Sequence, residues 1–104
     1  MNKHEEAVRR ALEDFCREYT GRDAGWRIET WLHPVTRSVE SAVVMPEFAG
    51  LGITGRITLI DDYLWTHLPK EHYVNLSLKL GLTPEEYEET DWMPDEAEVS
   101  LAAR

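Results

Sequence analysis

Two aspartates and two histidines near the middle of the chain are the residue types best suited to metal chemistry. Asp61 and Asp62 follow an apolar run directly, and His67 and His72 come shortly after them. Adjacent carboxylates at the end of a strand can hold Mg²⁺ or Ca²⁺, and imidazoles could complete a mixed site. Helix capping also explains the aspartates, and a five-residue spacing turns the two histidines apart on a helix. A metal-binding module or small enzyme built on these four residues is one hypothesis.

A glycine-rich segment offers a second kind of chemistry. Gly50, Gly52 and Gly55 spell the pattern G-x-G-x-x-G. The dinucleotide fingerprint requires a strand before this pattern and a helix after it, so that phosphate meets helix N–H groups. The residues that follow, Arg56-Ile57-Thr58-Leu59-Ile60, are typical of a strand. The segment is therefore interpreted as a turn entering a strand, and no cofactor is predicted.

Nucleophilic catalysis finds little support. Cys16 lies in an apolar helical stripe, where a small buried hydrophobe is the usual role. As the single cysteine, it also excludes an internal disulfide framework and a zinc site built from cysteines. The serines match no nucleophile elbow. The sequence favours a non-enzymatic protein and indicates no catalytic residue.

Acidic residues dominate one end of the chain. The 104 residues include 20 acids and 11 bases, a net charge of −9. Residues 1–60 hold 9 acids and 8 bases, whereas residues 61–104 hold 11 acids and 3 bases. Such a surface repels nucleic-acid phosphates and anionic membranes and favours a basic partner. We therefore expect no direct binding of nucleic acid or membrane.

The densest acidic stretch, residues 85–98, is a candidate docking element. It contains eight acids and no base, with Tyr87 and Trp92 as possible apolar anchors. The usual alternative for such a run is a solvated helix and tail. The leading hypothesis is a small interaction or regulatory protein that engages a protein partner through its acidic C-terminal third, and this charge favours a basic partner. The residues predicted to bind the partner are Trp31, Glu85, Glu86, Tyr87, Glu88, Glu89, Asp91 and Trp92.

The sequence patterns around these residues predict helices and strands that form an α+β domain. Residues 2–20 place apolar side chains along one helical face. Residues 26–32, 38–45 and 53–60 alternate like strands, and short connections favour a three-stranded antiparallel meander. The helix is expected to cover the apolar face of that meander.

Two or three short helices are expected after the sheet. Asp61 or Asp62 would cap the first of them. The segment Tyr73–Leu80 is ambiguous, because its leucines alternate like a strand but also fill one helical arc. We interpret Gly81-Leu82 as a helix C-cap, which predicts a helix over residues 69–80. Thr83-Pro84-Glu85-Glu86 is a capping box that begins another helix. Residues 1–91 would form one domain and residues 92–104 an acidic, frayed tail.

The second face of the predicted sheet is a further candidate interface. Trp31, Ala42, Val44 and Ile60 would lie opposite the N-terminal helix. Either helix 69–80 covers this face, or the face binds a partner, which includes a second copy of the chain in a homodimer through Trp31. The chain shows no export signal and no apolar run of roughly 20 residues, so a cytoplasmic location is expected.

Overall fold

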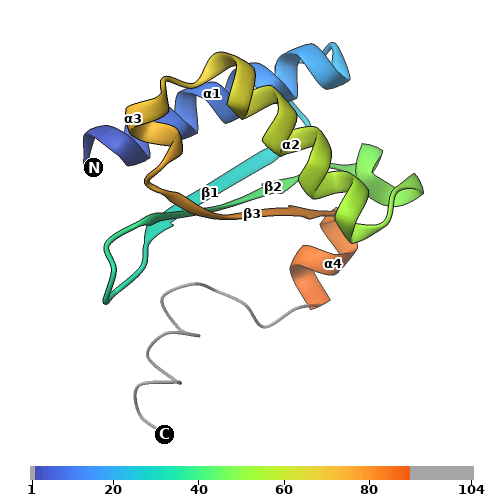
Figure 1. Ribbon diagram of the computed structural model, residues 1–104. Coiled ribbons are helices and arrows are strands. Elements are labelled where there is room, and N and C mark those ends of the chain that lie inside the picture. The colour runs from blue at the N-terminus through green and yellow to red at the C-terminus, as the bar shows by residue number, and fades with distance from the viewer. Residues whose placement is uncertain (1, 90–104) are drawn as a thin grey trace, which may run out of the picture.

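The computed structural model describes residues 2–89 (Figure 1). It confirms the α+β class, with the N-terminal helix packed on a three-stranded sheet. Within the described residues, no helix is long and apolar enough to cross a membrane. The elements are α1 (Lys3–Thr20), β1 (Arg27–Leu32), β2 (Val39–Val44), the 3₁₀ helix η1 (Pro46–Gly50), α2 (Ile53–His67), α3 (Lys70–Tyr73), β3 (Leu76–Leu82) and α4 (Pro84–Glu89).

Helix α1 forms as its sequence predicts. The Asn2 side chain accepts a hydrogen bond from the backbone N–H of Glu5 at 2.8 Å, which satisfies a donor of the first turn. Gly21 ends the helix in the left-handed conformation with φ of 70°. The predicted apolar stripe is buried, with Val8, Leu12 and Cys16 fully enclosed.

The third strand is not the one predicted, so the antiparallel meander is wrong in its last pairing. Residues 53–60 form the first half of α2, because Arg56, Ile60 and Leu64 are buried at helical spacing. Strand β2 pairs antiparallel with β1 but parallel with β3. Parallel neighbours need a crossover connection, and α2 provides it. The strand order is β1-β2-β3.

Other predictions around α2 also require correction. The expected helix over residues 69–80 is wrong, because α3 ends at Tyr73 and the alternating leucines belong to β3. Asp61 and Asp62 lie inside α2 and cap nothing. The glycine-rich turn enters this helix and not a strand, and η1 separates it from β2.

The sheet has two unlike faces. Helices α1 and α2 pack against one face (Figure 1). Val43, Phe48 and Ile60 join the buried core on that side. The opposite face carries α4 at one end, so the expectation that helix 69–80 would cover it is wrong. Ile60, placed on this face by the sequence, lies in the core instead. We call this surface the α4 face, and its strand residues are Arg27, Glu29, Trp31, Glu40, Ala42, Val44, Leu78, Leu80 and Leu82.

Candidate functional site on the α4 face

Cross-strand rows give the α4 face an apolar centre. One row runs from Glu29 on β1 through Ala42 on β2 to Leu80 on β3, and its last two residues are apolar. Ala42 is fully buried, whereas Leu80 is only half-buried. Leu78 and Leu82 extend the apolar surface along β3 and are half-buried as well. Edge strand β3 thus presents three leucines to the side of the sheet opposite α1 and α2.

Acidic side chains border this apolar centre on the strands. The indole of Trp31 donates a hydrogen bond to the Glu40 carboxylate across the β1–β2 pair at 2.7 Å. Arg27 forms an ion pair with Glu29 at 3.2 Å, and the Glu29 carboxylate offsets the positive charge of the guanidinium. The face therefore combines an aromatic ring, leucines and carboxylates.

Helix α4 joins the sheet through Tyr87. The Tyr87 hydroxyl donates to a Glu29 carboxylate oxygen at 2.7 Å, and the Arg27 guanidinium lies 4.8 Å from the centre of the Tyr87 ring. Burial, followed by the bond to Glu29, raises the pKa of the Tyr87 hydroxyl above its ordinary value. Trp31 and Tyr87, far apart in the sequence, thus belong to one surface.

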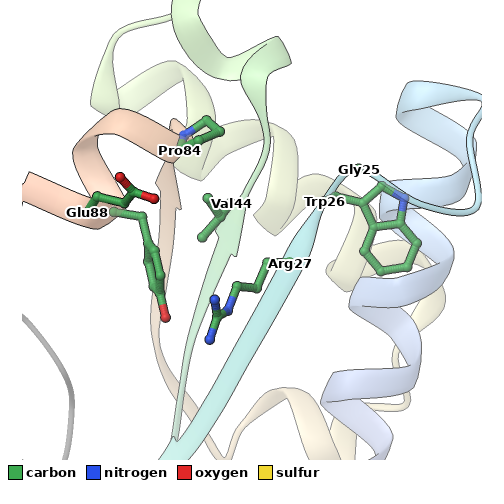
Figure 2. A pocket seen from close by; sticks show the side chains of 7 residues that line it. Gly25, Trp26, Arg27, Val44, Pro84 and Glu88 are labelled. Atoms are coloured by element: carbon green, nitrogen blue, oxygen red, sulfur yellow. The ribbon is translucent and has the colours of Figure 1, made fainter.

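A pocket of about 270 Å³ opens between α4 and the start of β1. Figure 2 shows Val44 between the α4 residues Pro84 and Glu88 on one side and Arg27 on the other. Besides Tyr87, the remaining lining residues are Gly25 and Trp26. Sequence reasoning identified Tyr87 and Glu88 and placed Val44 on this face. It missed Trp26 and Pro84, because only the parallel crossover brings α4 beside β1.

The beginning of α4 is fixed by the capping box that the sequence predicts. The Thr83 backbone N–H donates to the Glu86 carboxylate at 2.8 Å, and the Glu86 N–H donates to the Thr83 hydroxyl at 3.2 Å. The same Glu86 oxygen pairs with a guanidinium nitrogen of Arg56 at 2.6 Å. Arg56, and after it the Thr83 N–H, lower the pKa of Glu86 below its ordinary value.

Arg56 belongs to the segment predicted as a strand, but it lies on α2 and is buried against β3. Its side chain also donates to the carbonyl oxygens of Leu51 at 2.9 Å and Gly81 at 3.1 Å. The guanidinium lies 5.9 Å from the centre of the Phe48 ring. Arg56 thus links η1, β3 and α4, and it positions the acidic helix against the sheet. No sequence pattern signals a buried arginine.

The outward side of α4 is acidic. Glu85, Glu88 and Glu89 are exposed, and none of them pairs with a base within residues 2–89. Asp91 and Trp92, also predicted to bind the partner, lie outside the described residues. So does the predicted tail over residues 92–104.

The four candidate metal ligands have separate environments. The Asp61 carboxylate accepts hydrogen bonds from Lys79 and Tyr73. The His67 ring contacts the Tyr63 carbonyl oxygen. The His72 ring contacts the His4 ring at 2.8 Å. In the described part of the chain, no three His, Cys, Asp or Glu side chains gather as a metal site would require. Asp62 is exposed and lines a separate pocket between α1 and α2.

The Asp61 network predicts a pH-dependent contribution to stability. Hydrogen bonds from Lys79 at 2.8 Å and Tyr73 at 2.7 Å hold the pKa of Asp61 below its ordinary value of 3.8. Asp61→Asn should lower the free energy of unfolding at pH 7 by roughly 1 kcal/mol, discounted for partial exposure. Because the folded pKa is depressed, this difference should persist above pH 3.8 and vanish as the pH falls through the folded pKa.

Urea unfolding of both proteins across this pH range measures the effect. Asp62→Asn is the matched control, because Asp62 is the next residue of α2, is exposed and has no ion pair within the described residues. An equal loss in both variants would contradict the assignment.

Cys16 is poorly placed for nucleophilic chemistry. It is fully buried in α1. Burial, with a smaller effect of Glu13, raises the pKa of the thiol to about 12. The thiolate, which is the reactive form, is therefore scarce at neutral pH.

Comparison with known proteins adds no functional assignment, because the chain matches no family model, no curated protein and no solved structure.

Proposed function

We propose that the chain is a non-enzymatic interaction protein that binds a basic protein partner on the α4 face. The observation that carries the proposal is the pocket beside α4, which places an apolar floor next to exposed carboxylates. An apolar side chain of the partner would enter the pocket over Val44 and Pro84. Lysine or arginine residues flanking that side chain would meet the acidic side of α4.

Charge complementarity supports a basic partner over a second copy of the chain. Between residues 61 and 89 the sequence has seven acids and two bases. Two copies joined through this face would bring their α4 carboxylates together, and like charges at an interface are unfavourable. A homodimer is accordingly an outcome that would count against the proposal.

The test uses charge reversal on α4. Reversing Glu85, Glu88 and Glu89 to lysine should abolish retention of a partner from native lysate by the immobilised full chain at low salt. The three residues are exposed, so the fold should persist. Because the attraction involves exposed charges, retention by the unchanged chain should also weaken steeply with rising salt.

The matched control reverses three exposed acids on α1 and α3, away from the α4 face, namely Glu6, Asp14 and Glu71. It changes the net charge equally and should retain the same partner. Equal loss in both triple variants would indicate only unspecific attraction to an acidic chain. Failure to retain any protein, or sedimentation of the free chain as a dimer that the α4 reversal disrupts, would overturn the proposal.

A further inference from the structure

A second cavity lies on the opposite side of the sheet, between α1 and α2. It has a volume of about 350 Å³. We call it the α1–α2 groove, and its lining residues are Phe15, Glu18, Tyr19, Leu59, Asp62 and Tyr63. It shares no residue with the α4 face.

Three aromatic rings form much of the groove wall. Phe15 and Tyr19 stack nearly parallel, with ring centres 5.5 Å apart and an angle of 10° between the planes. Tyr63 meets Phe15 edge-on at 5.5 Å. Tyr19 keeps 41% of its surface exposed. The negatively polarised face of such a ring attracts a cation placed over it.

The groove also contains two carboxylates, those of Glu18 and Asp62. Neither Glu18 nor Asp62 forms an ion pair with any residue among those the structure describes. Glu18 accepts a hydrogen bond from the Tyr63 hydroxyl through one oxygen, and a carboxylate has further acceptor sites. Arg17, the neighbour of Glu18 in sequence, instead pairs with Asp14 and Asp23.

The hydrogen bond to Tyr63 also fixes the shape of the groove. Burial, and after it the bond to Glu18, raise the pKa of the Tyr63 hydroxyl, so it stays protonated and donates. His67 stacks on the Tyr63 ring with centres 4.0 Å apart. The ring and the Glu18 carboxylate are thus held in place before any ligand arrives.

We propose that the α1–α2 groove binds an arginine side chain of a protein, stacked on the aromatic wall and paired with Glu18 and Asp62. A guanidinium fits better than an ammonium, because it is planar, stacks on rings and donates to carboxylates in a fork. With the α4 face on the other side of the sheet, the chain would then have two separate binding surfaces.

The test is a titration of the ¹⁵N-labelled full chain with the peptide acetyl-Gly-Gly-Arg-Gly-Gly-amide, followed by NMR. Saturable changes in the amide chemical shifts should be concentrated at the groove residues of α1 and α2. The peptide with citrulline in place of arginine has the same shape without the charge and should produce no saturable shifts. Asp62→Asn and Glu18→Gln should each weaken binding by about two- to fivefold, as expected for the loss of one exposed ion pair.

Glu6→Gln is the matched control, because it changes the net charge equally on the same helix and outside the groove. Its binding should match that of the unchanged chain. Equal binding of the citrulline peptide, or equal weakening by Glu6→Gln, would overturn the proposal. Because the readout is confined to α1 and α2, its failure leaves the α4 face proposal standing, and the reverse also holds.

Discussion

Replacing Gly81 with alanine is expected to lower the free energy of unfolding by about 2 kcal/mol, within the range for overpacked cores. A Cβ at this position would lie 2.8 Å from Cβ of Arg56 and 3.0 Å from the Phe48 ring. Cβ of Arg56 is fixed to the α2 backbone, so a rotation of side chains cannot relieve this contact. The helix and the strand would have to move apart. Urea unfolding at pH 7 measures the loss.

Gly50→Ala is the control for this substitution. Gly50 is exposed, and an added Cβ would meet nothing within 4 Å. Its free energy of unfolding should change by less than about 0.5 kcal/mol. If Gly81→Ala were equally harmless, the close contact between β3 and α2 would be wrong.

Arg56→Met should have the largest effect, a loss of about 3 kcal/mol, the lower end for a broken buried ion pair. The buried carbonyl of Gly81 and the partly buried carbonyl of Leu51 would lose a charged donor. Glu86 would lose its partner, although its side chain is 41% exposed and can be rehydrated in part, which limits the loss. The same unfolding measurement applies.

Two further variants separate charge from geometry at this site. Arg56→Lys keeps the charge but lacks the planar fork, so it should recover only part of the stability. Glu86→Gln in the Arg56→Met background should cost less than it does alone, because the two residues share one interaction. Arg56→Met should also weaken partner binding, since Arg56 positions α4. A stable Arg56→Met protein would contradict the assigned role of this residue.

The sequence predicted the elements whose local signals agree with their tertiary environment. Helix α1 has caps at both ends and one apolar stripe, and it forms as expected. The capping box before α4 is equally local, and both of its hydrogen bonds are present. The first two strands also alternate clearly, so β1 and β2 lie close to their predicted positions.

The region between β2 and α4 could not be predicted in the same way. The β-branched residues of 53–60 favour a strand locally, but burial of Ile60 and Leu64 on one side selects a helix. Gly81 resembled a helix C-cap, whereas the structure needs glycine there because α2 approaches β3 closely. The burial of Arg56 and the close approach of α2 to β3 depend on tertiary packing, so they produce no periodic pattern in the sequence.

The candidate site likewise contains some residues that the sequence predicted and others that it did not. Trp31 and Tyr87 were recognised by residue type, and the structure places both on the α4 face. The pocket beside them depends on the parallel β2–β3 pairing, which sets α4 next to β1. That pairing was not predicted, so Trp26 and Pro84 were missed.

The most direct measurement is an NMR titration of the ¹⁵N-labelled full chain with the protein that the unchanged chain retains from lysate. Amide signals should shift first along β3 and α4 and around the pocket at Val44 and Glu88. Reversal of the three exposed α4 glutamates should remove these shifts. Shifts that spread evenly over the molecule, or that survive this reversal, would contradict partner binding on the α4 face.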